Sequence, residues 1–126
     1  MTDPIQLIGN VASPYTRKMV AYLRYKRIPY EVIWGQPEDI LISMNIEAPK
    51  PILLPVFILD RDGQATAVTD STPLIREFED KYPDRSVLPN NPALNFINFV
   101  LEDFGDEWCT KFMFHYRWHF DEDADN

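Results

Sequence analysis

The stretch that most constrains this chain is Gly9–Arg17, with the sequence Gly-Asn-Val-Ala-Ser-Pro-Tyr-Thr-Arg. An apolar run with strand character ends at Gly9, and a helical spacing of apolar residues begins at Pro14. Serine before proline is a strong helix start, because the serine hydroxyl can cap the first turn and proline lacks an N–H that would be unpaired there. The stretch therefore predicts a strand–loop–helix corner with Ser13 at the positive end of a helix, which favours an anion.

The composition excludes several classes of protein. The 126 residues suffice for one domain with its own core. No apolar run approaches the ~18 residues that cross a membrane, and the N-terminus lacks the basic-then-apolar pattern of a secretory signal. The single cysteine, Cys109, rules out an internal disulfide and fits a reducing cytoplasm. The net charge of −8 argues against a nucleic-acid surface, which needs a basic stripe.

Apolar spacing predicts the regular elements of the first 82 residues. We expect a helix over 14–27, with cations at its negative end, and strands over 30–34, 56–59 and 65–69. Residues 60–63 form the turn between the last two strands, since Asp-Gly is a strong hairpin signal. Residues 36–47 are ambiguous, because Gly35 and Pro37 obscure the start of a short helix. Asp70-Ser71 caps a further helix. The strand that ends at Gly9 and the strand over 30–34 should pair in parallel, since the helix over 14–27 joins them.

A polar, proline-containing linker over 83–92 predicts a domain boundary. Beyond it, a helical pattern over 92–118 is crowded with aromatic residues on every side. A helix that is apolar all round is normally buried all round, so we expect it to require partners outside this chain. The charge also changes: residues 1–101 carry 12 acidic and 10 basic side chains, a net of −2, and residues 102–126 carry 8 and 2, a net of −6. The acidic residues 121–126 are expected to be frayed.

This order of elements is that of the thioredoxin-like fold, an α/β fold with a mixed four-stranded sheet. Three motifs, Ser13–Arg17, Leu54-Pro55-Val56 and Asp70-Ser71, resemble the N-terminal domain of the glutathione S-transferases, and the next helix resembles the first helix of their all-helical second domain. The resemblance covers about residues 4–118. It implies a glutathione-binding domain over 1–82, a linker over 83–92, and over 93–126 the start of an incomplete helical domain with an acidic tail. Because family members are considerably longer, we expect this chain to be truncated.

The resemblance implies that Ser13 is the catalytic residue. Glutaredoxins, which are similar, have Cys-Pro-Tyr-Cys at this corner, but here the two cysteine positions are Ser13 and Thr16, so dithiol redox chemistry is excluded. A serine can instead donate a hydrogen bond to the sulfur of glutathione and, beside a helix N-terminus, favour the thiolate that attacks a hydrophobic electrophile. The alternative is that Ser13 is a helix cap only, although one side chain can do both.

The resemblance also implies the residues that bind glutathione. Pro55 matches a cis-proline that exposes the backbone of Leu54 to the peptide part of glutathione; an ordinary trans proline is the alternative. Asp70 suits the ammonium group of glutathione and Ser71 its γ-glutamyl carboxylate, or the pair merely caps a helix. Tyr15 completes the set.

Leu53 departs from the family pattern, because many members have a lysine there that reaches the glycyl carboxylate. Lys50 or Trp34 could substitute for it.

Two further patterns are weaker. His115 and His119 have the spacing of two zinc ligands on one helix face, but they lack a third ligand, and we expect no metal. Glu102, Asp103, Asp106 and Glu107 are interpreted as a solvated face, and Cys109 as a packing residue. Two function classes remain. One is a glutathione transferase, expected to be cytoplasmic and, as family members usually are, a homodimer; the other is a non-catalytic glutathione-transferase-like module used for binding or assembly.

Overall fold

The computed structural model describes residues 3–125, and the chain divides into two compact units, residues 1–86 and 87–126. The division falls within residues 83–92, the predicted linker. The parts of the predicted domains and acidic tail that fall on residues 1, 2 and 126 lie outside the described residues.

The first unit is built on a four-stranded mixed sheet with the order β2-β1-β3-β4. β1 pairs in parallel with β2 and antiparallel with β3, and β3 pairs antiparallel with β4. The turn between β3 and β4 is tight, because Asp62 and Gly63 both have positive φ, 56° and 81°, as a two-residue hairpin of type I′ requires. The strands are β1 Ile5–Gly9, β2 Tyr30–Trp34, β3 Val56–Arg61 and β4 Gln64–Val68.

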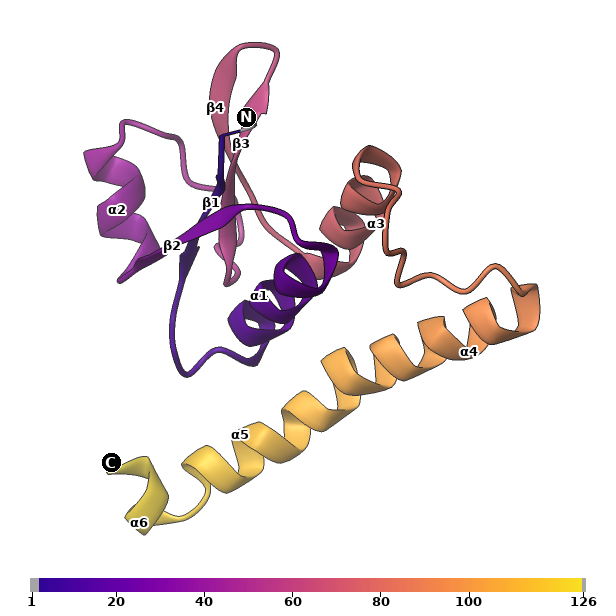
Figure 1. Ribbon diagram of the computed structural model, residues 1–126. Helices are drawn as coiled ribbons and strands as arrows, with labels where there is room; N and C mark the ends of the chain where they lie inside the picture. The colour runs from indigo at the N-terminus through magenta and orange to yellow at the C-terminus, as the bar shows by residue number, and fades with distance from the viewer. Residues whose placement is uncertain (1–2, 126) are drawn as a thin grey trace. The chain divides into compact units, whose positions relative to one another are not determined.

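Helices cover both faces of this sheet (Figure 1). α2 (Pro37–Ser43) packs on one face, where Leu41 contacts Ile8 and Val56. α1 (Pro14–Lys26) and α3 (Ser71–Lys81) lie on the other face, where the rings of Phe57 and Phe78 meet edge to face at 5.6 Å. The thioredoxin-like α/β fold expected from the sequence is confirmed.

A buried ion pair joins α1 to α3. Lys26 Nζ lies 2.9 Å from Glu79 Oε1, and the side chains are 0% and 6% exposed. Tyr22 donates a hydrogen bond to the same oxygen at 2.8 Å, Ser86 donates to Oε2, and Lys26 also donates to the carbonyl of Tyr82. Burial raises the pKa of the Glu79 carboxyl, but these hydrogen bonds and the Lys26 charge outweigh it, so its pKa lies below the ordinary value.

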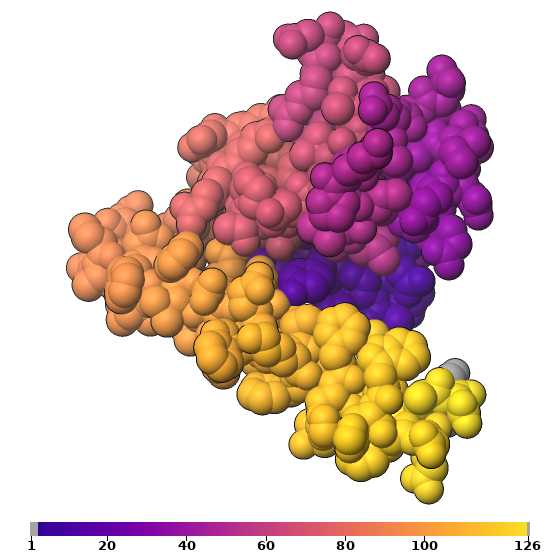
Figure 2. Space-filling view, turned by 180° about the vertical axis from the view of Figure 1, so that it is seen from behind, coloured from indigo at the N-terminus to yellow at the C-terminus, as the bar shows by residue number. Residues whose placement is uncertain are grey.

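The second unit is one long helix followed by a short helical turn. α4 (Pro92–Asp103) begins at Asn91, whose side chain accepts hydrogen bonds from two backbone N–H groups of the first turn. It continues through a π-helical segment, η1 (Phe104–Cys109), into α5 (Thr110–Trp118), and α6 (Asp121–Ala124) follows. No described residue of these four segments is buried. The large aromatic side chains of this unit are exposed. Figure 2 draws the unit in orange to yellow.

The structure corrects several sequence-based expectations. Asp60 and Arg61, assigned to a turn, extend β3, because the two-residue turn needs only Asp62 and Gly63. Lys26 is a cation of the last turn of α1, as expected of that helix end, and the structure adds that it is buried against Glu79. The segment 121–124, expected to be frayed, forms α6.

Cys109, interpreted as a packing residue, is exposed, because its helix lacks a core of its own. Within residues 3–125, every helix is too short or too polar to span a bilayer.

Candidate functional site

The corner after β1 is built by local hydrogen bonds. Asn10 accepts a hydrogen bond from the N–H of Ala12 at 2.8 Å, which turns the loop, and the N–H of Ser13 donates to the Asn10 carbonyl at 3.1 Å. Ser13 is the N-cap of α1, and its Oγ accepts a hydrogen bond from the N–H of Thr16 at 3.1 Å. The capping role predicted for Ser13 is confirmed. Ser13 is half-buried, so its hydroxyl is not sealed in the core.

Close packing fixes this corner against the strand. A Cβ added at Gly9 would lie 2.6 Å from Cγ2 of Thr16, a residue that is buried. The Oγ1 of Thr16 accepts a hydrogen bond from the N–H of Asn10 at 3.4 Å. Only glycine at position 9 therefore allows the first turn of α1 to approach the end of β1 this closely.

The pairing of the strands brings the second motif to the same edge of the sheet. Ile8, next to the end of β1, pairs with Val56, the first residue of β3. The Leu54-Pro55 peptide bond immediately before β3 is cis, as the resemblance implies. Pro55 is buried, whereas Leu54 is half-buried.

The third motif reaches this edge through β4. Val68, the last residue of β4, pairs with Phe57 near the start of β3, and the chain then enters α3. Asp70 is the N-cap of α3 and accepts a hydrogen bond from the N–H of Thr72 at 3.3 Å. Its φ of 79° is unusual for a residue with a side chain, a strain that is typically kept at functional positions. Ser71 is buried at the first position of the helix.

A lysine links the two helix N-termini. Lys18, one turn into α1, donates a hydrogen bond through its Nζ to Ser71 Oγ at 3.3 Å. The contact connects residues 53 positions apart and places a positive charge where the dipole of α3 is also positive. No sequence pattern singles out Lys18. The only local feature that could have pointed to Lys18 is its position, one helical turn after Pro14. Its partner, Ser71, is distant in the sequence.

The structure thus gathers the predicted site residues at one edge of the sheet. Ser13 and half-buried Tyr15 come from the start of α1, Leu54 and Pro55 from the entry to β3, and the Asp70-Ser71 pair from the start of α3. Together they present a hydroxyl at a helix N-terminus, a strand entry and a polar cap beside a lysine. This arrangement can hold a small molecule with an anionic group, because two helix N-termini and an ammonium group favour negative charge.

Neither Leu53 nor the pair of His115 and His119 is part of such a cluster of polar groups. Leu53 is exposed, as are Lys50 and Trp34, the two residues that could replace the family's lysine. The rings of His115 and His119 stack at 4.6 Å. Within residues 3–125, no group of three or more metal-ligating side chains could hold an ion.

Comparisons with known proteins agree with this fold. Residues 7–86 match the family model described as the glutathione S-transferase N-terminal domain. A glutathione S-transferase from Methylobacterium radiotolerans, crystallised with glutathione sulfonate, is 26% identical, with a TM-score of 0.74, over 95% of this chain and 55% of that one. A glutathione S-transferase from Rhodospirillum rubrum is 25% identical, with a TM-score of 0.65, over 90% and 47%.

A more distant structure shares the fold. Maleylacetoacetate isomerase from Anaeromyxobacter dehalogenans, with bound glutathione, is 17% identical, with a TM-score of 0.63, over 79% of this chain and 47% of that one. No curated protein sequence matches the chain significantly. The chain spans about half the length of these three structures. Because the matched N-terminal domain covers more than half of its residues, the chain belongs to the glutathione S-transferase family.

Proposed function

We propose that this protein is a glutathione transferase that binds glutathione at the edge of the sheet where β1, β3 and β4 meet α1 and α3. The observation that carries the proposal is the placement of Ser13 at the N-terminus of α1, on the same edge as Pro55 and Ser71. Membership of the family and two structures with glutathione or its sulfonate bound support it. The proposal includes conjugation to a small hydrophobic electrophile, as in detoxification, by a cytoplasmic homodimer.

Ser13 activates the thiol in this proposal. Its Oγ accepts a hydrogen bond from the N–H of Thr16, and a hydroxyl that accepts still has its own O–H to donate. Donation to the sulfur of glutathione stabilises the thiolate relative to the thiol, and the positive end of α1 acts in the same direction. The thiolate then attacks an electrophilic carbon and forms a C–S bond. Either a leaving group departs with its bonding pair, or the π pair of an activated double bond moves to the neighbouring carbon, which takes up a proton from water.

The remaining residues bind the tripeptide. The backbone of Leu54 pairs with its peptide part. The hydroxyl and N–H of Ser71, with the Lys18 ammonium group beside them, hold the γ-glutamyl carboxylate, and Asp70 accepts from the ammonium group of the ligand. Tyr15, in the first turn of α1, lines the same corner.

One observation favours the alternative, a non-catalytic binding or assembly module. Leu53 is an exposed apolar residue at the position where many relatives have a cation for the glycyl carboxylate. A weak hold on that carboxylate would lower the affinity for glutathione without removing the other contacts.

Calorimetry with glutathione, followed by a conjugation assay with an aromatic electrophile, tests the proposal. We expect the wild-type protein to bind glutathione, and Ser13→Ala to keep the affinity within about tenfold while conjugation is lost, because the serine acts on the thiolate. Absence of glutathione binding would refute the proposal. Binding without turnover in the wild-type protein would favour the non-catalytic module.

A further inference from the structure

A pocket of about 740 Å³, within the range of small-molecule sites, lies at the C-terminal ends of α1 and α3. Residues 26–28 at the end of α1 and residues 81–85 at and after the end of α3 line it. All of them belong to the first unit. None of the residues proposed to bind glutathione is among them, so this pocket is separate from the proposed glutathione site.

The lining of this pocket carries more positive than negative charge. Lys26 is neutralised by its ion pair with Glu79, so it does not count toward the charge of the pocket. Three other cations stand against one acidic residue, which leaves an excess of two positive charges. The cations are Arg27, Lys81 and Arg85, and the acidic residue is Asp84. The pocket is therefore positive in a chain whose net charge is −8.

Carboxylates do not bind these three cations. Among residues 3–125, none of the three forms a salt bridge. Glu77, one turn before Lys81, already binds Arg61 through both of its oxygens. The helix dipoles favour cations at the C-terminal ends of α1 and α3, and they account for Arg27 and Lys81. They do not account for Arg85, which lies four residues beyond the end of α3.

The side chain of Arg85 is held in place by Tyr25. Its Nε donates a hydrogen bond to the Tyr25 carbonyl, and its guanidinium carbon lies 4.7 Å from the centre of the Tyr25 ring. This anchor uses one of the five N–H donors of the guanidinium group and leaves those of the two terminal nitrogens. An anchored guanidinium group loses little conformational freedom when an anion binds, and its paired N–H groups suit the oxygens of a phosphate.

A buried hydrogen bond brings the cations of two helices to one pocket. The Nζ of Lys26 donates to the carbonyl of Tyr82, which ties the end of α1 to the residue after α3. Arg27 is the C-cap of α1, and Lys81 is the last residue of α3, with its Nζ 5.6 Å from the centre of the Tyr82 ring. The charges of the pocket thus come from α1, from α3 and from the segment that follows α3.

We propose that this pocket binds an oligophosphate chain, the group that inorganic polyphosphate and nucleoside triphosphates share. Three cations from three segments match a ligand with several anionic groups, and the anchored guanidinium group of Arg85 offers a bidentate contact to one of them. The site does not use glutathione, so it stands whether or not the proposed transferase activity is found.

Calorimetric titration of the 126-residue chain with sodium tripolyphosphate, in buffer free of divalent cations, tests the site. Orthophosphate is the ligand control, and we expect it to bind at least about tenfold more weakly, because one phosphate cannot contact all three cations. ATP is the third ligand: an affinity equal to that of tripolyphosphate assigns the site to the phosphate chain alone, and a higher affinity assigns it to a nucleotide. Arg85→Gln and Arg27→Gln should each weaken tripolyphosphate binding by about tenfold.

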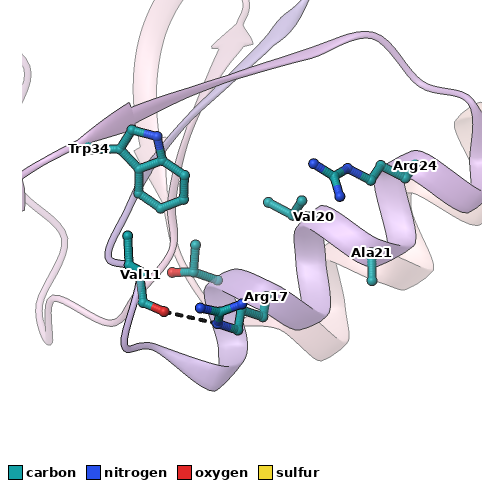
Figure 3. A pocket seen from close by; sticks show the side chains of 7 residues that line it. Val11, Arg17, Val20, Ala21, Arg24 and Trp34 are labelled. Atoms are coloured by element: carbon teal, nitrogen blue, oxygen red, sulfur yellow. Dashed lines mark hydrogen bonds between the residues drawn. The ribbon is translucent and has the colours of Figure 1, made fainter.

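Arg17→Gln is the matched protein control. Arg17 is exposed like Arg85, and its Nε also donates to a backbone carbonyl, that of Val11 at 2.9 Å, but it lies near the other end of α1 (Figure 3). The substitution removes the same charge and the same kind of anchor, so it should leave tripolyphosphate binding unchanged.

Arg27→Gln keeps the proposal testable if Arg85→Gln loosens its own segment. Within residues 3–125, the Arg27 side chain has no hydrogen bond or salt bridge to lose. Three results would each overturn the proposal: absence of tripolyphosphate binding, equal affinities for tripolyphosphate and orthophosphate, or losses in Arg27→Gln and Arg85→Gln no larger than the loss in Arg17→Gln.

Discussion

Replacing Lys26 by methionine should destabilise the first unit strongly, because it leaves the buried carboxylate of Glu79 without its counter-ion. The Lys26 side chain is 0% exposed and that of Glu79 is 6% exposed, with 2.9 Å between the charged atoms. Removing one partner of a buried ion pair costs about 3–5 kcal/mol. The variant keeps the hydrogen bonds that Tyr22 and Ser86 donate to Glu79, so we expect the lower end, about 3 kcal/mol.

The chain contains a matched control on its surface. Arg61 of β3 binds Glu77 of α3 through two hydrogen bonds, of 2.8 and 2.6 Å, but these side chains are 43% and 37% exposed. Exposed pairs contribute about 0–1 kcal/mol, so Arg61→Met should cost at most about 1 kcal/mol. Urea unfolding at neutral pH, with ellipticity as the signal, measures both losses. Equal losses in the two variants would refute the reasoning that burial decides the effect.

The same pair predicts a pH dependence. The pKa of Glu79 is lowered in the folded chain, so its stabilisation is present above the ordinary pKa of 4.5 and is lost as pH falls through the lowered value. In Lys26→Met the ion pair is absent, and protonation of Glu79 removes the uncompensated charge. The difference in unfolding free energy between wild type and variant should therefore shrink below about pH 4.5. A difference that is constant from pH 7 to about pH 3 would contradict this account.

Two further predictions concern the site itself. Lys18→Met should weaken glutathione binding by about tenfold in calorimetry, because the ammonium group beside Ser71 stabilises a carboxylate, and Lys18→Arg should restore most of the affinity; equal affinities in all three proteins would show that the lysine plays no part. Gly9→Ala should lower the unfolding free energy by about 1–3 kcal/mol, since the new methyl group would lie 2.6 Å from the buried Thr16 side chain. A loss below about 0.5 kcal/mol would show that the Thr16 side chain can move aside at little cost, and would contradict the close packing of this corner.

Local signals explain which parts of the fold could be predicted from the sequence. Ser13-Pro14 defines the start of α1, and the Asp62-Gly63 turn defines the hairpin, because each acts through its own backbone. The start of α2 stayed ambiguous because Pro37, which can break a helix, here occupies the first turn, where proline is tolerated. The π-helical segment η1 has no local signature in the sequence that we could identify.

The interactions that escaped prediction join residues far apart in the chain. Lys26 meets Glu79 and Lys18 meets Ser71 across 53 positions each, and nothing in the sequence near either lysine identifies its partner. The convergence of the three site motifs was available only through the resemblance to a family. Strand pairing supplies its physical basis, since the Ile8–Val56 pair brings the motifs to one edge.

The central claim is that Ser13 makes glutathione a better nucleophile by stabilising its thiolate. The most direct measurement is the pH titration of bound glutathione by the ultraviolet absorbance of its thiolate, in the wild-type protein and in Ser13→Ala. We predict a thiol pKa about 2 units below that of free glutathione in the wild type, and a return to nearly the free value in the variant. The same pKa in both proteins, or a wild-type value equal to that of free glutathione, would contradict the account.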